Sequence, residues 1–358
     1  MGRLMSSILV TGGAGFIGTN FVRYWVEKNP DDSIIVLDAL TYAGNKNNLV
    51  SFLDQPNFKF VEGSICDKNL VDGIFNEHKI NRVVHFAAES HVDRSIEGPD
   101  EFINTNIIGT YQLLKSASAI WKKRNISDHL FHHVSTDEVY GSLSSGEPGF
   151  SESNAYAPNS PYSASKAASD HLVRSYHHTY GLKTTTSNCS NNYGAYQFPE
   201  KLIPLCLINI LKGKSLPIYG DGKQIRDWLH VDDHCRGIEL VIKNGTCGDT
   251  YNIGGENEWQ NIDVVTSICE VVNELFTQSS ELHSLFPNSP CAKSRDAKTL
   301  IAYVPDRPGH DVRYAIDAGK IRSDLGFSPS ITFDKGVKST VKWYIDNQDW
   351  WLSILNKD

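Results

Sequence analysis

The chain has 358 residues, of which 40% are hydrophobic and 21% are charged, with 27 glycines and 14 prolines. This composition excludes collagen-like, coiled-coil and mainly disordered proteins, and the length indicates a large α/β domain with a smaller companion. The formal net charge is -8 and no long basic block occurs, which argues against nucleic-acid binding.

Short β-branched runs alternate with longer segments of helical spacing through the first half of the chain. Strands are predicted at 8–10, 34–37, 58–61, 83–86, 130–134 and 184–187, and helices at about 16–28, 67–78, 100–124 and 161–180. Such alternation implies βαβ crossovers, in which helices cover both faces of a parallel sheet. The predicted fold class is therefore α/β, with a doubly wound Rossmann sheet.

After about residue 191 the pattern becomes irregular, with Gly/Pro-rich loops and two further helices at 263–276 and 333–346. These pieces suit a smaller α/β domain laid over the carboxyl ends of the strands, where open sheets of this kind bind ligands. The predicted division gives 1–190 and 227–249 to a dinucleotide-binding domain, with 227–244 returning to it as a helix. Residues 191–226 and 250–358 form a substrate-binding domain.

A glycine-rich turn follows the first predicted strand and opens a helix. Gly12, Gly15 and Gly18 have the spacing that lets backbone approach a pyrophosphate at a helix N-terminus. Asp38 ends the second strand, where a carboxylate binds the adenosine ribose and repels a 2′-phosphate. The pattern predicts a site for NAD rather than NADP, the alternative being a turn that only packs a helix on a strand.

Two groups of residues suggest chemistry. Tyr162 and Lys166 are i, i+4 neighbours near a predicted helix start, where an ammonium favours the phenolate of a tyrosine base, although such pairs also occur on solvated helix faces. Thr136, Asp137 and Glu138 follow the strand at 130–134, and two adjacent carboxyls can act as acid and base if their pKa values differ. Exposed loop acids or helix N-terminal charges are the alternative interpretation.

Longer strings extend these motifs over nearly the whole chain. They include TGGAGFIG (11–18), HFAAESHVDRS (85–95), STDEVYG (135–141), SPYSASKAASDHLVRSY (160–176), LPIYGDGKQIRDWLHVDDH (216–234) and DRPGH (306–310). In these strings the chain resembles the extended short-chain dehydrogenase/reductases and, within them, the dTDP-glucose 4,6-dehydratases. STDEVYG and DRPGH are far more specific than the Tyr-Lys spacing.

The resemblance implies a lyase that uses NAD to convert a nucleotide-diphosphate hexose, dTDP-glucose, into a 4-keto-6-deoxy sugar, as in rhamnose biosynthesis. Tyr162, assisted by Lys166 and Thr136, would take the 4-hydroxyl proton while hydride passes from C4 to NAD. Glu138 would remove the C5 proton, Asp137 would protonate the departing C6 hydroxyl, and hydride would return to C6. The alternatives are UDP-glucose as substrate, a nucleotide-sugar 4-epimerase or decarboxylase, and a non-catalytic NAD-sensing or scaffolding protein.

The resemblance also assigns binding positions residue by residue. The expected NAD contacts are Gly12, Gly15, Phe16, Ile17, Gly18, Asp38, Ser64, Ile65, Ala87, Ala88, Glu89, Ser90, His91, Thr105, Tyr162, Lys166 and Asn192. The expected substrate contacts are His91, Thr136, Asn191, Lys201, Leu202, Pro217, Ile218, Tyr219, Arg226, Asn261, Asp306, Arg307 and His310. The two arginines are the expected diphosphate ligands, because a guanidinium binds phosphate oxygens in pairs.

The chain departs from the family pattern at two positions. Ser64 stands where the family usually has an acidic residue before Ile-Cys-Asp, so a hydroxyl would have to make the adenine contact. Ala195 replaces the family's proline after Asn-Tyr-Gly, which removes a restraint on φ from a loop near the substrate. A homodimer is implied, with the helices at 100–124 and 161–180 shared between subunits.

The cysteine, histidine and apolar residues indicate whether the chain binds a metal, which compartment it occupies and whether it associates with a membrane. The seven cysteines include no CxxC pair and the histidine pairs have no acidic or cysteine cluster at ligand spacing, so no metal is expected. The cysteine usage predicts a reducing, cytoplasmic location. The longest apolar stretch, 202–211, is far shorter than the ~20 residues that a membrane span requires, so no membrane association is expected.

Overall fold

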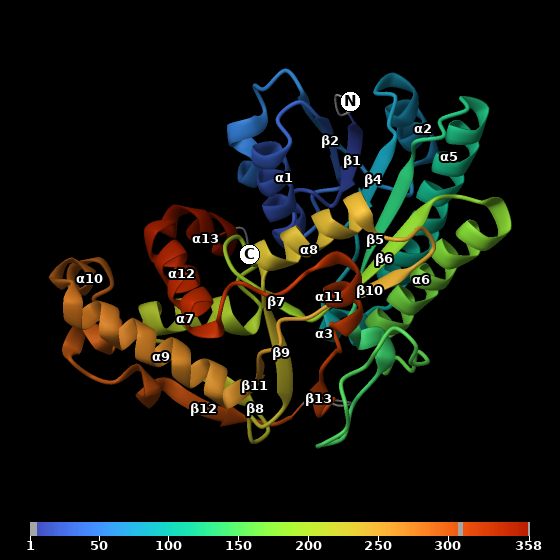
Figure 1. Cartoon of the computed structure of the whole chain (residues 1–358). Helices are drawn as coiled ribbons and strands as arrows, with labels where there is room; N and C mark the ends of the chain where they lie inside the picture. The colour runs from blue at the N-terminus through green and yellow to red at the C-terminus, as the bar shows by residue number, and fades with distance from the viewer. Residues whose placement is uncertain (1–5, 307–310, 357–358) are drawn as a thin grey trace.

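The structure is a computed structural model that describes residues 6–306 and 311–356. Its larger layer is a seven-stranded parallel sheet with strand order β10-β6-β5-β4-β1-β2-β3 (Figure 1). The strands are β1 (Ser7–Thr11), β2 (Ser33–Asp38), β3 (Phe58–Glu62), β4 (Arg82–His85), β5 (Leu130–Thr136), β6 (Thr184–Cys189) and β10 (Thr250–Ile253). This order contains the 3-2-1-4-5-6 arrangement of the doubly wound Rossmann fold, so the predicted fold class is confirmed.

Helices cover both faces of this sheet because successive strand residues point to opposite faces. Ile8 and Val10 of β1 pack in one apolar cluster with α1 (Phe16–Lys28) and α8 (Val231–Asn244). Leu9, between them, packs in a second cluster with the helices of the other face. Those helices are α2 (Lys68–Glu77), α5 (Thr110–Lys123) and α6 (Pro161–Tyr180).

The helix predicted at 100–124 is a run of three pieces. A short α4 (Asp100–Phe102) leads into a π-helical segment η2 (Ile103–Gly109), which continues into α5. Inside η2 the Asn106 amide bonds both the backbone N–H and C=O of Glu89, at 2.9 and 3.0 Å. The wider π-helical turn therefore joins this helix to the loop after β4, and such π-bulges are frequent at functional sites.

The second part of the chain lies below and to the left of the main sheet in Figure 1. In its four-stranded sheet, β9 (Ile225–His230) pairs with β7 (Asn191–Tyr193), β11 (Glu258–Gln260) and β13 (Arg313–Tyr314). A separate pair joins β8 (Leu216–Tyr219) to β12 (Ile301–Val304).

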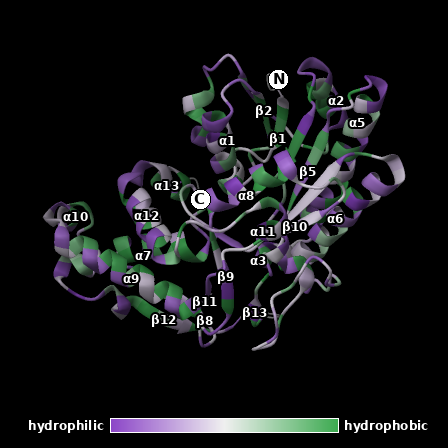
Figure 2. Cartoon of the chain, viewed as in Figure 1, coloured by the Kyte–Doolittle hydropathy of each residue, from purple (hydrophilic) through white to green (hydrophobic). Residues whose placement is uncertain are grey.

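Three helices supply most of the apolar core of this second part. They are α7 (Leu202–Lys212), α9 (Asn261–Gln278) and α12 (Phe333–Asp346). Helix α7 is apolar nearly all round and is largely green in Figure 2, as expected of a helix surrounded by core. The remaining short helices are α3 (Val92–Glu97), α10 (Ser280–Leu285), α11 (Gly319–Leu325) and α13 (Gln348–Leu355).

The chain passes from one sheet to the other at the start of α8 and again after β10. Residues 227–230 are not helical but complete β9 in the second sheet, and the helix starts at Val231, where His230 is the N-cap and accepts from the Asp232 N–H. Strand β10 belongs to the main sheet, where it pairs with β6, although the predicted division placed it after the boundary. Helix α8 packs on the main sheet and so returns the chain to the open edge beside β6.

Within residues 6–306 and 311–356, every helix is too short or too polar to span a bilayer. Within the same ranges, no three histidine, cysteine or acidic side chains are grouped as they would be around a metal ion.

Candidate active site

A cavity of about 530 Å³ lies at the carboxyl ends of the main-sheet strands. Its walls come from the glycine turn, the ends of β2, β4 and β5, the start of α6, and the segments 189–192 and 197–201. Residues from both parts of the chain therefore enclose one space, in the position where open α/β sheets bind their ligands.

The glycine turn fits a diphosphate. A Cβ on Gly12, whose φ is +69°, would lie 2.6 Å from the Ala87 nitrogen, and one on Gly18 would lie 2.2 Å from the Gly12 oxygen. Helix α1 starts at Phe16 with Gly15 as its N-cap, and no side chain caps its first amides. These amides line the cavity with the positive end of the helix dipole, which favours an anion.

Asp38 is held at the end of β2, on the wall of the same cavity. Its two carboxylate oxygens accept hydrogen bonds from the Ala14 and Leu40 N–H groups, both at 2.9 Å. Burial raises the pKa of Asp38, while these two backbone bonds oppose the shift. The carboxylate is fixed in direction and keeps lone pairs for ribose hydroxyls, so the glycine turn and Asp38 together fit NAD.

Replacing Gly18 with alanine is expected to lower the free energy of unfolding by about 1–3 kcal/mol and to weaken NAD binding, because the new Cβ would force the turn apart. Thermal unfolding and calorimetric NAD titration measure the two effects. Gly73→Ala is the matched control: Gly73 lies inside α2 and its Cβ would meet nothing within 4 Å. This control should stabilise the protein slightly, and equal behaviour of the two variants would contradict the close approach at Gly18.

The candidate catalytic side chains converge on the end of β5. Helix α6 starts at a capping box in which the Ser160 hydroxyl accepts from the Ser163 N–H at 3.0 Å, with Pro161 as the first helical residue. This start places Tyr162 and Lys166 one turn apart on the wall of the cavity. The Lys166 ammonium donates to the carbonyl of Val134 at 2.9 Å, next to the strand end.

Electrostatics separate the two adjacent acids. Asp137 is 2% exposed, and burial, followed by the charges of Glu138 and Asp227, raises its pKa well above the usual range. One of its oxygens accepts from the Thr136 hydroxyl at 3.3 Å, and the other is buried with no hydrogen-bond partner among the described residues. Glu138 is only partly buried. The environment of Asp137 therefore favours its protonated form, beside a carboxyl in a wetter environment, which is the arrangement of an acid and a base.

Burial is also the largest influence on the pKa values of Tyr162 and Lys166. It raises the pKa of Tyr162 well above its usual value, with a further rise from Glu138 and an opposing hydrogen bond with Thr136. It lowers the pKa of Lys166, and the charge of Asp170 opposes that shift. Cationic charge in the cavity would favour the phenolate that a tyrosine base requires.

All the predicted NAD positions line the cavity except His91. That side chain caps α3, where Nδ1 accepts from the Arg94 N–H at 3.3 Å, and Nε2 lies 3.5 Å from a carboxylate oxygen of Glu200. Neighbouring residues that were not named individually also line the cavity. Among them are Thr41, Tyr42, Glu101, Gln197, Phe198 and Glu200. Four of these six lie in LDALTYAGN (37–45) and FPEKLIP (198–204), two further strings in which the sequence resembles the family.

Only some of the predicted substrate-binding residues line this cavity. Thr136, Asn191 and Lys201 line the cavity. Besides His91, the described positions that do not line it lie on β8 (Pro217, Ile218, Tyr219), at the starts of α7 and α9 (Leu202, Asn261), on β9 (Arg226) and after β12 (Asp306). Ile218 is 2% exposed and its side chain packs in the second apolar core, and the Asp306 carboxylate accepts from the Gln224 amide at 3.1 Å. Arg307 and His310 lie outside the described residues.

Arg226 is positioned by backbone. Its guanidinium donates to the carbonyls of Ile225 and Asp311 at 2.7 and 3.0 Å and lies 4.4 Å from the centre of the Tyr314 ring. Its charge lowers the pKa of Asp137, which places it within electrostatic reach of the catalytic group. A phosphate role for Arg226 stays a prediction.

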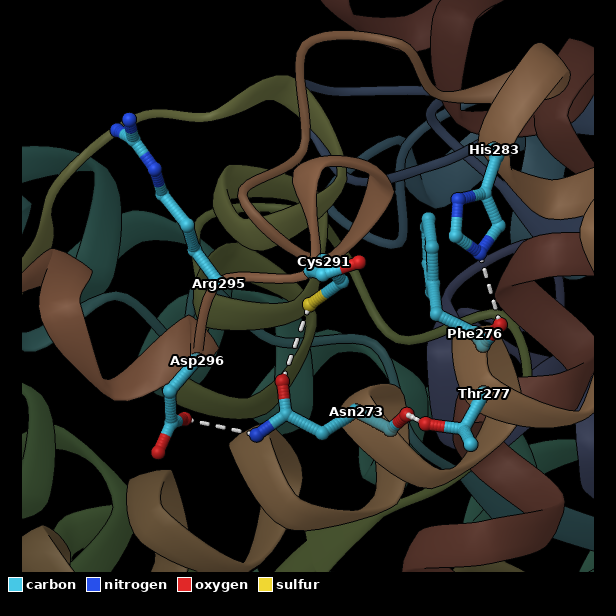
Figure 3. A pocket seen from close by; sticks show the side chains of 8 residues that line it. Asn273, Phe276, Thr277, His283, Cys291, Arg295 and Asp296 are labelled. Carbon is cyan, nitrogen blue, oxygen red and sulfur yellow. Dashed lines mark hydrogen bonds between the residues drawn. The ribbon is translucent and has the colours of Figure 1, made fainter.

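A second hollow of about 420 Å³ lies at the far end of the second part, between α9 and α10 (Figure 3). Its polar groups bind one another: Asn273 accepts from Cys291 at 3.1 Å and donates to Asp296 at 2.7 Å. Both ring nitrogens of His283 contact backbone carbonyls, at 3.1 and 2.9 Å. No predicted site residue lines it, and these contacts join the 291–296 loop to α9 and α10.

Comparisons with known proteins agree over nearly the full length. A family model described as GDP-mannose 4,6 dehydratase matches residues 9–340. A dTDP-glucose 4,6-dehydratase of Neisseria meningitidis serogroup B is 52% identical over 355 residues, which cover 98% of this chain and 97% of that protein. The crystal structure of a dTDP-glucose 4,6-dehydratase from Streptomyces venezuelae with NAD and TYD bound has a TM-score of 0.85 and 44% identity, over 97% of this chain and 99% of that one.

A solved structure with a different reaction in its name shares the fold. The UDP-glucose 4-epimerase of Thermotoga maritima with UDP-glucose has a TM-score of 0.80 and 27% identity, over 96% of this chain and 99% of that one. The fold alone is thus compatible with two reactions, and the side chains at the end of β5 must distinguish them.

Proposed function

The chain belongs to the GDP-mannose 4,6 dehydratase family and, within it, to the dTDP-glucose 4,6-dehydratases, and from this premise we propose how its residues perform the reaction. The protein is a lyase that dehydrates dTDP-glucose to dTDP-4-keto-6-deoxyglucose in deoxysugar biosynthesis. NAD is the cofactor, and when bound it supplies reversible hydride transfer, from C4 of the sugar and back to C6.

The main-sheet part of the chain binds NAD in this proposal. The uncapped first turn of α1 holds the diphosphate, and Asp38 binds the adenosine ribose. Ser64 lines the adenine side, where its hydroxyl also accepts from the Cys66 N–H at 3.1 Å. The second part supplies most of the contacts to the nucleotide sugar, with Arg226 as the diphosphate ligand among the described residues.

Proton transfers in this scheme belong to side chains at the end of β5 and the start of α6. Tyr162 takes the proton of the C4 hydroxyl, while Thr136 holds the same oxygen by a hydrogen bond and Lys166 stabilises the phenolate. The C4 carbonyl acidifies the C5 hydrogen, which Glu138 removes. Asp137, protonated by virtue of its burial, gives its proton to the C6 hydroxyl as water leaves.

The observation that carries this proposal is the unequal pair Asp137 and Glu138 in the same cavity as Tyr162 and Lys166. An epimerase oxidises and reduces the same carbon, so it does not require an acid and a base for elimination. Incubation with dTDP-glucose should give a 4-keto-6-deoxy sugar, recognised by its chromophore in alkali. Formation of dTDP-galactose without the keto sugar would contradict the proposal.

Preference for the nucleotide is a separate measurement. dTDP-glucose and UDP-glucose differ by a methyl group and a ribose hydroxyl, and one methyl in a pocket is worth only ~1–3 kcal/mol of discrimination. We expect kcat/KM for dTDP-glucose to exceed kcat/KM for UDP-glucose, by a ratio that corresponds to a free-energy difference within that range, when the two substrates are compared side by side. A clear preference for UDP-glucose would leave the reaction unchanged and correct the substrate.

A homodimer is the proposed assembly. Apolar side chains on η2 and α5 are exposed in the single chain: Ile103, Ile108 and Tyr111 are 44%, 49% and 39% exposed. Tyr180, at the end of α6, is 64% exposed, and α6 packs beside both η2 and α5. A second copy that covers this helical face would bury these groups.

Replacing both Ile108 and Tyr111 with glutamate is expected to give monomers, because pairing two copies would bury four added carboxylates. Sedimentation velocity measures the mass. Tyr303→Glu is the control, since Tyr303 is 61% exposed on β12 in the other part of the chain. A wild-type protein with the mass of one chain would refute the homodimer.

The proposed compartment is the cytoplasm. All seven cysteines are free thiols, five of them buried, which suits a reducing environment.

A further inference from the structure

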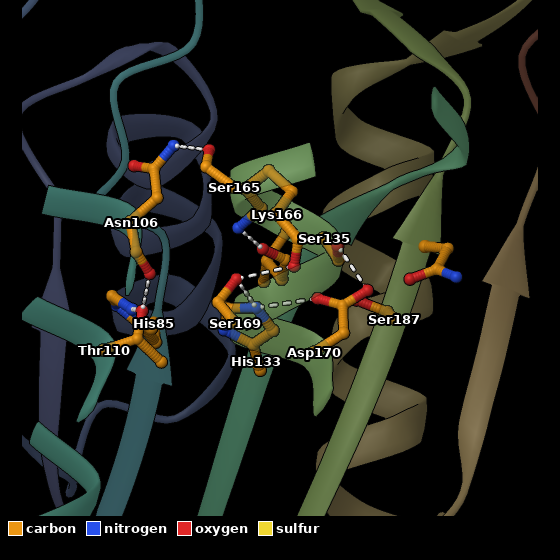
Figure 4. A network of polar contacts seen from close by, with 12 residues as sticks. His85, Asn106, Thr110, His133, Ser135, Ser165, Lys166, Ser169, Asp170 and Ser187 are labelled. Atoms are coloured by element: carbon orange, nitrogen blue, oxygen red, sulfur yellow. Dashed lines mark hydrogen bonds and ion pairs between the residues drawn. The ribbon is translucent and has the colours of Figure 1, made fainter. Parts of the chain in front are cut away.

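A network of buried polar groups includes Lys166 and Asp170 of α6 (Figure 4). Asp170 is one turn beyond Lys166 on α6, and the two are 5% and 4% exposed. His133, Ser135 and Ser169 belong to the same network and are 0%, 4% and 0% exposed. The proposed reaction uses Lys166 but gives no role to Asp170.

The ammonium and the carboxylate are anchored on consecutive residues of β5. Lys166 Nζ donates to the carbonyl of Val134 at 2.9 Å, and the hydroxyl of Ser135 donates to Asp170 Oδ2 at 2.9 Å. The other carboxylate oxygen lies 3.0 Å from His133 Nε2. Asp170 is therefore fixed in direction at the strand end where the chemistry takes place, although it does not line the cavity.

The other titratable groups around Lys166 and Asp170 do not supply the negative charge that a buried ammonium requires. They are Tyr162 and His171 on α6, His133 on β5, His85 on β4, Cys189 on β6, and Tyr140 and Tyr156 from the segment before α6. Burial lowers the pKa of His133 and of His85 well below the usual value, so both rings are neutral. Burial raises the pKa of Cys189, so its thiol is neutral as well.

We propose that Asp170 is the buried counter-charge that keeps Lys166 in its ammonium form, and hence a positioning residue for the Tyr162–Lys166 pair. The inference rests on the proposed function, in which Lys166 assists Tyr162. Asp170 touches neither substrate nor cofactor and acts only through the lysine.

The direction of each shift supports this assignment. Burial raises the pKa of Asp170 to about 6, and the charge of Lys166 is the largest influence against that rise. Burial lowers the pKa of Lys166, and Asp170 is the first opposing influence. At neutral pH the carboxylate is ionised and supports the ammonium. Removing it takes away the support, so the lysine would lose its proton at a lower pH.

The test is Asp170→Asn in the full chain with NAD, with kcat for dTDP-glucose measured across pH. The alkaline limb should move by at least about one unit to lower pH, with kcat above pH 8 reduced about tenfold or more, because one pKa unit is a tenfold change in the charged fraction. Ser169→Ala is the matched control. It removes a buried hydroxyl that donates to the Lys166 carbonyl at 2.7 Å and changes no charge, so its pH profile should match the wild type.

A titration of the wild-type protein does not depend on whether Asp170→Asn folds. The ¹⁵N signal of the Lys166 ammonium, assigned by its loss in Lys166→Met, should inflect near pH 6 as Asp170 takes up a proton. An unmoved alkaline limb in Asp170→Asn, or an ammonium signal without that inflection, would overturn the proposal. If the wild type does not convert dTDP-glucose, the proposed function fails, and the titration still tests the link between Lys166 and Asp170.

Discussion

Replacing Tyr162 with phenylalanine is expected to lower kcat by about 10³-fold or more while NAD binding and the fold are retained, since a positioned general base contributes about 10²–10⁴-fold. The ring is 9% exposed and packs edge-on against Phe102 with 6.3 Å between centroids, a contact that phenylalanine preserves. Only the hydroxyl is lost, and with it the group that takes the C4 proton. Steady-state formation of the keto sugar and calorimetric NAD titration measure the two effects.

A second buried phenol is the control for this variant. Tyr140 is 1% exposed, and its hydroxyl donates to Asn252 and accepts from Asn188, both at 3.0 Å. Tyr140→Phe removes the same atom three residues after Asp137, so it should cost stability, about 1–3 kcal/mol for the amide groups left unpaired, and keep kcat near that of the wild type. Equal losses of turnover in the two variants would show that Tyr162 acts through packing and not as the base.

The main sheet was predictable because its signals are local. Each strand from β1 to β6 is a short run rich in β-branched or aromatic residues. Helix α1 matches its predicted range, 16–28, because a glycine turn opens it and Asn29 ends it. The last strand, β10, carried no such signal: Thr250–Ile253 is four residues long and becomes a main-sheet strand only through pairing with β6. Likewise β9 is defined by partners far away in sequence, β7, β11 and β13.

The site residues also divide into those that local motifs predict and those whose contacts form only in the folded chain. The glycines, Asp38, Tyr162 and Lys166 stand at fixed spacings beside a strand end or helix start, so a motif predicts both their place and their neighbours. Contacts made across the fold were not predictable, such as His91 turning to Glu200, 3.5 Å away. The helical spacing alone puts Asp170 one turn beyond Lys166. Its burial was not predictable, because it depends on how α6 packs against β5.

Glu138→Gln and Asp137→Asn are each expected to lower dehydration by about 10²–10⁴-fold, and they should do so at different steps. Glu138 is the proposed base for the C5 hydrogen, so its variant should fail to exchange that hydrogen with solvent. Asp137 is the proposed acid for the C6 hydroxyl, so its variant should still exchange C5 in D₂O while water loss stalls. Mass spectrometry and NMR of recovered dTDP-glucose measure the exchange.

The split follows from the unequal burial of the two acids. Burial of Asp137, which is 2% exposed, and the nearby negative charges of Glu138 and Asp227 raise its pKa and favour its protonated form. Glu138→Gln removes one of those charges, so the pKa of Asp137 should fall and its acid function should be lost at a lower pH than in the wild type. The two variants serve as controls for each other. Solvent exchange at C5 in Glu138→Gln but not in Asp137→Asn would reverse the roles, and exchange in neither would assign both acids to the C5 step.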